Sequence, residues 1–369
     1  MSFKNIHQQY NWEETTQSIE SKTAQDVEFA LTKDRIDLED FKALISPAGE
    51  NYLEQMAQLS HRLTQKRFGK TIQLYIPLYL SNECANGCIY CGFNCQNKIS
   101  RHTLNKDEIL KEAEIIKSMG FEHLLLVTGE HLRNCGVDYI EEAIQLLRPH
   151  FASLSVEIAP MDLPDYNRLQ KHGLNTVYVY QETYHKERYS IYHPRGKKAD
   201  FDYRLETPDR LGKANIHRIG LGCLLGLENW RTDSFFTALH LQYLEKTYWR
   251  TKYSISFPRL RPHAGSFEPN YPVNDKQLVQ LISAYRIFNG ELEISLSTRE
   301  NPIFRNNMIG LGVTNMSAGS KTEPGGYANP NKELKQFEVS DERSPAEVSG
   351  VIQSAGYETV WKDWDQCLM

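Results

Sequence analysis

The stretch Ile72-Gln-Leu-Tyr-Ile-Pro-Leu-Tyr-Leu80, followed shortly by Cys84-Ala-Asn-Gly-Cys88-Ile-Tyr-Cys91, decides how the rest of the chain is interpreted. The first part is apolar and aromatic and predicts a strand. The second part gathers three cysteines within eight residues, with the spacing C-x3-C-x2-C. A strand that leads directly into a dense group of thiols predicts a chemical site at the carboxyl end of that strand.

From Thr71 onward, segments typical of strands and of helices alternate along the chain. The expected strands are Ile72–Leu80, His123–Thr128, Leu154–Ile158, Thr176–Tyr180, Arg218–Leu225, Ser254–Pro258, Glu291–Ser297 and Met308–Asn315. The expected helices are Lys106–Met119, Asp138–Arg148, Pro164–His172, Tyr203–Ala214, Ser234–Trp249, Asp275–Phe288 and Asn301–Asn307. Such alternation implies an α/β fold with a parallel sheet, and eight units predict a closed (β/α)8 barrel of the TIM type. The chemistry of such barrels lies at the carboxyl ends of the strands.

The barrel is expected to span residues 71–323, between two segments of different character. Residues 1–70 predict a helical extension, in which Thr23-Ala-Gln-Asp26 opens one amphipathic pattern. Residues 324–369 form a polar tail with a short helix near Ala346–Ser354. We expect this tail to pack on the barrel, where it closes the bottom, or on a partner.

Composition excludes several classes of function. The 369 residues carry a net charge of −5 and no basic tract, so nothing suggests nucleic acid. Apolar runs such as Ile219–Leu227 are too short to span a bilayer, and the polar N-terminus has no secretory segment. Seven cysteines in such a chain favour the reducing cytoplasm and thiol or metal chemistry over disulfides.

Thiolates are soft ligands that suit iron–sulfur clusters or zinc. Three thiolates would leave one iron of a four-iron cluster open to bind and reduce a small molecule. Zinc usually takes four ligands, often as two separated pairs, and no second C-x-x-C pair occurs here. The remaining cysteines are isolated: Cys95, Cys135, Cys223 and Cys367. A zinc site is therefore the weaker alternative, and Cys95 stays unassigned.

The cysteine motif after a first strand resembles that of the radical S-adenosylmethionine (SAM) superfamily. The resemblance implies that Cys84, Cys88 and Cys91 hold a [4Fe–4S] cluster whose fourth iron chelates the amino and carboxylate groups of SAM. Reduction then cleaves SAM to methionine and a 5′-deoxyadenosyl radical. Tyr90 matches an aromatic position that packs near adenine, although it could equally be a hydrophobic plug.

Polar residues at later strand ends extend the resemblance to the rest of the SAM site. Gly129 and Glu130 follow the second strand and match a Gly-Gly-Glu-like motif that binds the methionine amino group, with Thr128 in place of the first glycine. Glu157 is implied to bind the SAM ribose, or else forms a salt bridge inside the barrel, and Glu182 is a similar case.

Two arginines after the fourth strand complete this set. Arg204 and Arg210 could reach the SAM carboxylate, since a guanidinium binds carboxylates with two parallel hydrogen bonds. The exposed face of a helix would explain either arginine nearly as well.

Further motifs narrow the resemblance to the ThiH family of 2-iminoacetate synthases, which are tyrosine lyases. They are Ile76–Asn82, Cys91–Phe93, Gly120–His131, Tyr180–His185, Ser256–Pro262, Leu296–Glu300, Ser317–Thr322, Pro324–Tyr327 and Trp361–Trp364. The family cleaves the Cα–Cβ bond of L-tyrosine to 2-iminoacetate (dehydroglycine) and p-cresol, for the thiazole of thiamine. The resemblance also implies a complex with the thiazole synthase ThiG and a flavodoxin-type reductant.

A tyrosine substrate requires a cation for its carboxylate. Arg299, at the end of the seventh strand, is the best candidate, with Ser317 after the eighth strand as a second donor and Tyr79 as a contact. Each has an ordinary alternative: Arg299 could pair with Glu300, Ser317 could cap a turn, and Tyr79 could pack inside the barrel.

Several choices stay open at this level. Arg259 and Arg261 are alternative carboxylate ligands because they also follow a strand. The phenol proton needs a group that titrates near neutral pH, and the candidates are His131, His185 and His263.

Three other functions compete. A related tyrosine lyase of hydrogenase maturation carries further cysteines after the barrel, where this chain has only Cys367. Another radical SAM lyase, such as one acting on tryptophan, would share most motifs. A non-catalytic iron–sulfur scaffold would bind metal without cleaving SAM.

Overall fold

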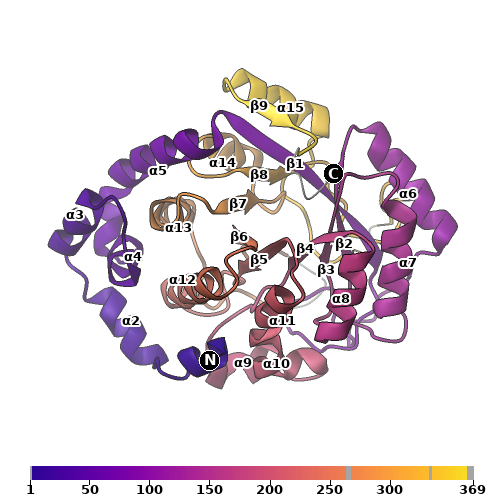
Figure 1. The fold of residues 1–369 in the computed structure, drawn as a ribbon, viewed down its shortest axis with the longest axis horizontal. Coiled ribbons are helices and arrows are strands. Elements are labelled where there is room, and N and C mark those ends of the chain that lie inside the picture. The colour runs from indigo at the N-terminus through magenta and orange to yellow at the C-terminus, as the bar shows by residue number, and fades with distance from the viewer. Residues whose placement is uncertain (1, 263–266, 332–334, 364–369) are drawn as a thin grey trace.

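The structure of the chain, a computed structural model, describes residues 2–262, 267–331 and 335–363. Eight parallel strands form a closed barrel, in which neighbouring strands follow one another along the chain and β1 pairs with both β2 and β8 (Figure 1). The strands are β1 (Thr71–Ser81), β2 (His123–Thr128), β3 (Ser153–Glu157), β4 (Leu174–Tyr178), β5 (Arg218–Gly222), β6 (Lys252–Ser256), β7 (Glu293–Leu296) and β8 (Asn315–Ser317). The predicted (β/α)8 barrel is therefore confirmed.

Helices surround the barrel on the outside, as the alternating pattern predicts. They are α6 (Lys106–Ser118), α7 (Val137–Leu147), α8 (Leu163–Lys171), α9 (Lys186–Tyr192), η2 (Lys197–Ala199), α10 (Phe201–Leu205), α11 (Thr207–Lys213), α12 (Trp230–Thr247), α13 (Asp275–Phe288) and α14 (Pro302–Asn307). None of the described helices combines the length and the apolar character that crossing a membrane requires.

The expected eighth strand, Met308–Asn315, is wrong. This apolar run contains Gly310 and Gly312, whose φ angles of 87° and 124° lie in the left-handed region and turn the chain. The strand forms only afterwards, as β8, and Ser317 is its last residue rather than a residue that follows it.

The helical region after β4 also differs from the prediction. The single helix expected over Tyr203–Ala214 is two helices, α10 and α11, and α11 begins with a proline in its first turn. Proline suits a first turn because it has no N–H to donate, but it interrupts a continuing helix. Helix α9, which precedes them, was not predicted.

The first seventy residues form a belt of helices around one side of the barrel (Figure 1). They comprise α1 (Phe3–His7), α2 (Trp12–Glu20), α3 (Ala24–Thr32), α4 (Leu38–Ile45), η1 (Ala48–Tyr52) and α5 (Leu53–Phe68). The belt packs mainly on α12 and α13. The expected helix start at Thr23 is confirmed, since Thr23 and Asp26 form a capping box, in which each side chain accepts from the other's backbone N–H.

The last forty residues contact both ends of the barrel. Residues 335–341 cross the end where the strands terminate, with backbone bonds to Thr298 and Thr322. The chain then forms α15 (Pro345–Ser354) and β9 (Glu358–Val360), and β9 pairs with the first residues of β1, which extend beyond β2. Finally, the backbone N–H of Asp363 donates to the ring of His123 at the opposite end of the barrel.

Candidate functional site

A large cavity opens at the carboxyl ends of the barrel strands, where the sequence predicts the chemistry. Twelve of the predicted site residues line it: Tyr79, Cys84, Cys88, Tyr90, Cys91, Gly129, Glu130, Glu157, Glu182, Arg204, Arg299 and Ser317. Arg210 lies elsewhere: its guanidinium donates to the carbonyls of Met161 and Tyr203 and stacks on the Tyr203 ring. Arg210 thus holds α10 in place and does not face the cavity.

The cysteines sit on a loop whose backbone is fixed by side chains of its own segment. Arg101 donates to four carbonyl oxygens of this region, including those of Asn82, Phe93 and Asn94. Asn94 donates to the carbonyl of Cys88 at 3.0 Å. These bonds fix the backbone of the loop between Asn82 and Asn97.

The donor set suits an iron–sulfur cluster, because it consists of three thiols, whose thiolates are soft ligands. Within the described residues, no three His, Cys, Asp or Glu side chains come close enough to hold one metal ion. Zinc bonds sulfur at about 2.3 Å, so its sulfurs would have to lie within about 4 Å of one another, whereas a four-iron cluster spreads its ligands more widely. The zinc alternative therefore finds no support in the geometry.

Burial favours the protonated form of the three thiols. Desolvation raises the pKa of Cys84 to about 11, and it raises the pKa of Cys88 and Cys91 as well. Binding of iron would displace these protons, because the thiolate is the form that binds metal. A Cβ on Gly129 would lie 2.2 Å from the carbonyl oxygen of Glu83, so the cysteine loop packs directly on that glycine.

Two carboxylates and two cations form a buried network beside the cysteines. Arg204 donates to Glu130 at 3.0 Å, and Lys198 donates to Glu182 at 2.6 Å. Asn86, on the cysteine loop, donates to the other oxygen of Glu130 at 2.8 Å. Burial alone would raise the pKa of both carboxyls, but the charges of Lys198 and Arg204 outweigh it and lower them. Both carboxylates are therefore ionised and can accept hydrogen bonds from an ammonium group.

Glu182 has an unusual backbone conformation for a non-glycine residue, with a φ of 70°. Such conformations cost on the order of 1–3 kcal/mol and persist where the surroundings enforce them, often at functional sites. Here the carbonyl of Glu182 accepts from the N–H of Leu224 at 2.8 Å, which ties it to the next strand end. The strain directs the Glu182 carboxylate into the network.

Tyr90 is hydrogen-bonded in the cavity wall. Its hydroxyl lies 2.8 Å from Nε2 of His193, and Nδ1 of His193 lies 2.9 Å from the carbonyl of Tyr189. Because only an N–H can face that carbonyl, Nδ1 carries the proton and Nε2 accepts from Tyr90. Burial raises the pKa of Tyr90 and lowers that of His193, so both groups are neutral.

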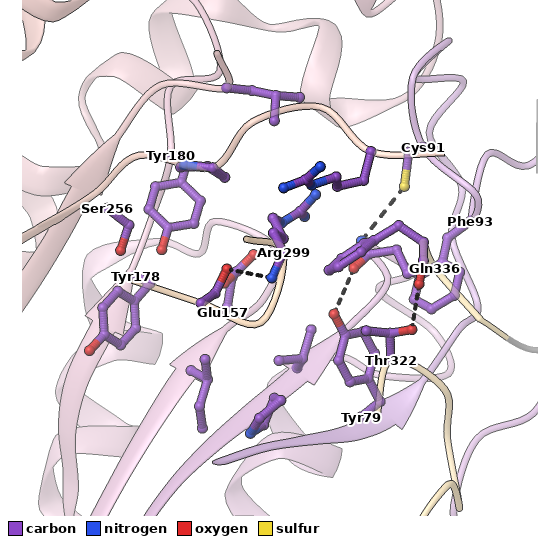
Figure 2. A pocket seen from close by; sticks show the side chains of 18 of the residues that line it. Tyr79, Cys91, Phe93, Glu157, Tyr178, Tyr180, Ser256, Arg299, Thr322 and Gln336 are labelled. Carbon is purple, nitrogen blue, oxygen red and sulfur yellow. Dashed lines mark hydrogen bonds between the residues drawn. The ribbon is translucent and has the colours of Figure 1, made fainter. Parts of the chain in front are cut away.

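Arg299 lies on the other side of the cavity, next to Glu157 (Figure 2). Its guanidinium stacks on the ring of Phe337, 3.5 Å from the ring centre. Burial raises the pKa of Glu157 to about 7, against the opposing charge of Arg299. The alternative pairing with Glu300 does not form, because Glu300 accepts from Arg259 and from Arg261.

Ser317 and Tyr79 line the same cavity as Arg299. The Ser317 hydroxyl oxygen accepts from the backbone N–H of Thr298 at 3.0 Å, so Ser317 holds the turn that presents Arg299. The Tyr79 hydroxyl donates to Oε1 of Gln336 at 2.7 Å. Tyr79 also meets the ring of Phe93 edge-on.

The sequence analysis missed several residues that line the cavity, among them Lys198, Gln336 and Phe337. Lys198 belongs to η2, a short helix that was not predicted. Gln336 and Phe337 belong to the polar tail, in which no local pattern indicates contact with the barrel. Their position follows from tertiary contacts alone.

The remaining candidates are the histidines proposed to handle the phenol proton and the arginines proposed as alternative ligands of the substrate carboxylate. Neither His131 nor His185 is among the described residues that line the cavity, and His263 lies outside the described residues. Arg259 is tied to Glu300 and to the carbonyl of Val273. Arg261 does line the cavity, where it donates to Glu300 at 3.0 Å.

Two family models match this chain. The model of the Radical SAM superfamily matches residues 78–236, and that of the Biotin and Thiamin Synthesis associated domain matches residues 256–358. The barrel, the cysteine loop and these matches define the class: this is a radical SAM protein, and its class uses a [4Fe–4S] cluster and SAM.

Curated relatives are similar over the whole length. The 2-iminoacetate synthase of Escherichia coli (strain K12) is 50% identical, over 100% of this chain and 98% of that protein. The same enzyme of Salmonella typhimurium is 49% identical over the same shares. The chain belongs to the 2-iminoacetate synthase (ThiH) family, as the motifs predict. The crystal structure of HydG, a maturase of the [FeFe]-hydrogenase, is also similar, with a TM-score of 0.90 at 33% identity, over 96% of this chain and 81% of that one.

Proposed function

We propose that this chain is a radical SAM lyase that cleaves the Cα–Cβ bond of L-tyrosine to 2-iminoacetate and p-cresol, for the thiazole moiety of thiamine. One observation carries the proposal: a single cavity is lined by three cysteines, an ionised carboxylate pair and the guanidinium of Arg299. Membership of the 2-iminoacetate synthase family supports the same activity.

The wall beside the cysteines suits SAM. Cys84, Cys88 and Cys91 would hold the cluster, and together cluster and SAM supply a 5′-deoxyadenosyl radical when bound. Glu130 and Glu182 would accept from the SAM ammonium group, since both are ionised. Arg204 and Lys198 would face its carboxylate, Gly129 would allow its amino-acid end to approach the backbone, and Tyr90 would contact adenine. Glu157, which is affected by the charges of both Arg299 and Arg204, would bind the ribose from between the two groups of residues.

The opposite wall suits an aromatic amino acid. Arg299 would bind the tyrosine carboxylate with both of its terminal nitrogens, and its stacking on Phe337 fixes the plane of the guanidinium. Ser317 holds the turn that presents Arg299, and its hydroxyl would donate a second hydrogen bond to the same carboxylate in place of its bond to Tyr75. Tyr79 would contact the substrate from β1. This arrangement would place the amino group between the two walls, close to the radical carbon.

The proposed activity suggests the partners and the setting. A one-electron donor of the flavodoxin type would reduce the cluster, and the thiazole synthase ThiG would accept the unstable 2-iminoacetate. The reducing cytoplasm would preserve the thiols and the cluster.

The test is an anaerobic reconstitution with iron and sulfide, followed by dithionite, SAM and either L-tyrosine or L-tryptophan. We expect 5′-deoxyadenosine and p-cresol together, only with L-tyrosine. Cyanide among the products would favour the hydrogenase-type lyase, and a tryptophan-derived product would favour another aromatic lyase. Full cluster content without any SAM cleavage would refute the proposal in favour of a scaffold.

A further inference from the structure

Gln336 lines the cavity beside Cys91 and Tyr79, although it belongs to the C-terminal segment rather than to the barrel (Figure 2). Its Oε1 accepts from the Tyr79 hydroxyl at 2.7 Å. Its Nε2 donates to Sγ of Cys91 at 3.7 Å, within the range of hydrogen bonds to sulfur. One amide therefore connects a residue proposed to contact the substrate with a sulfur proposed to bind the cluster.

The orientation of the amide is fixed by chemistry. A thiolate that binds iron has no proton, so it can only accept, and the amide nitrogen must face it. The amide oxygen is then left for Tyr79. Burial raises the pKa of Tyr79, which keeps the phenol protonated and able to donate. The reversed amide would place an oxygen against sulfur and lose the bond to Cys91, although the Tyr79 hydroxyl could still accept from the amide nitrogen.

The backbone around Gln336 is anchored on several sides. Its N–H donates to the carbonyl of Thr322 at 3.0 Å, and the hydroxyl of Thr322 donates to the carbonyl of Phe337 at 2.8 Å. The N–H of Glu338 donates to the carbonyl of Pro262 at 3.1 Å. A Cβ on Gly92 would lie 2.2 Å from the carbonyl oxygen of Gln336, so this segment rests directly on the cysteine loop.

We propose that Gln336 is a positioning residue that raises the reduction potential of the cluster through its hydrogen bond to the Cys91 sulfur and joins that sulfur to Tyr79. The proposal rests on the proposed function only in taking Cys91 as a cluster ligand. Reduction adds one electron, supplied by an external reductant such as dithionite, and neither makes nor breaks a covalent bond. The added negative charge spreads onto the cysteine sulfurs, where a hydrogen-bond donor stabilises it.

The test is a redox titration of the reconstituted protein without SAM, followed by the EPR signal of the reduced cluster. The variants are Gln336→Leu, which removes both bonds, and Gln336→Glu, which keeps the shape and the bond from Tyr79 but loses the donor to sulfur. We expect unchanged iron and sulfide content and a more negative midpoint potential in both. At the midpoint potential of the wild type, less than half of the variant cluster should then be reduced.

The matched control is Gln353→Leu, the same change at an exposed glutamine of α15, which should leave the potential unchanged. Midpoint potentials equal to the wild type in cluster-containing Gln336→Leu and Gln336→Glu would overturn the inference. If Gln336→Leu loses the cluster, Gln336→Glu decides the question. Absence of a cluster from the wild type itself, or its retention in Cys91→Ala, would instead refute the ligand assignment on which the proposal rests.

Discussion

Replacing Glu157 by glutamine should stabilise the cluster-free protein at alkaline pH and leave it nearly unchanged at acidic pH. Burial raises the pKa of this carboxyl to about 7, from an ordinary value of 4.5. Between these two values the folded protein holds a proton that the unfolded chain releases, so the free energy of unfolding falls as the pH rises. The loss is complete above pH 7, and glutamine, which has no proton to release, avoids it.

The size of the effect follows from the same pKa shift. One pKa unit corresponds to about 1.4 kcal/mol, so the full shift corresponds to about 3 kcal/mol. Between pH 5 and pH 8 the stability difference between Glu157→Gln and the wild type should grow by about 2.5 kcal/mol, because part of the loss already occurs below pH 5.

Urea unfolding at pH 5 and pH 8, monitored by tryptophan fluorescence, measures this difference. The matched control is Glu114→Gln, at an exposed position of α6, for which the difference from wild type should not depend on pH. A Glu157→Gln variant whose stability gap is the same at both pH values would show that Glu157 is ionised in the folded protein at pH 5. The argument that burial raises the pKa of Glu157 would then be wrong.

Three further substitutions test other parts of the structure. Asp341→Asn should lower the free energy of unfolding by about 3–5 kcal/mol, because it leaves the buried Arg305 without its charge partner; in urea unfolding, a loss below 1 kcal/mol would contradict this. Arg204→Gln should weaken SAM binding at least tenfold, or about 1.4 kcal/mol, by calorimetry on the reconstituted protein; equal affinity would remove Arg204 from the SAM site. Arg299→Lys should raise the KM for L-tyrosine roughly tenfold by losing the paired hydrogen bonds, with little change in SAM affinity; an unchanged KM would favour Arg261 as the carboxylate ligand.

Local sequence patterns predict most of the barrel because each strand and helix carries its own hydrophobic period. They fail where glycine decides the conformation: Met308–Asn315 has the apolar composition of a strand, but two left-handed glycines bend it before β8 can begin. They fail again at α9, a helix of seven residues, which is too short to show a full amphipathic pattern.

The site likewise contains residues that the sequence predicts and residues that it does not predict. Cys84 and Glu130 could be found because each follows a strand within a motif, and the barrel topology brings strand ends together. Gln336 and Phe337 could not, since nothing in a polar tail indicates that it returns across the mouth of the barrel. Arg210 shows the opposite error: its charge suggested a ligand, but nearby carbonyls use its hydrogen bonds.

The position of Gln336 near the end of the chain has a consequence for biogenesis. Ribosomes deliver the cysteine loop long before the segment that crosses it, because domains emerge from the N-terminus first. Until that segment has been synthesised, nothing covers the carboxyl end of the barrel, and the first residues of β1 are not paired with β9. Iron and sulfide delivered to the nascent protein would thus meet a wider entrance than the finished enzyme offers, and a chain that stops short of residue 336 would keep its cysteines but leave them uncovered.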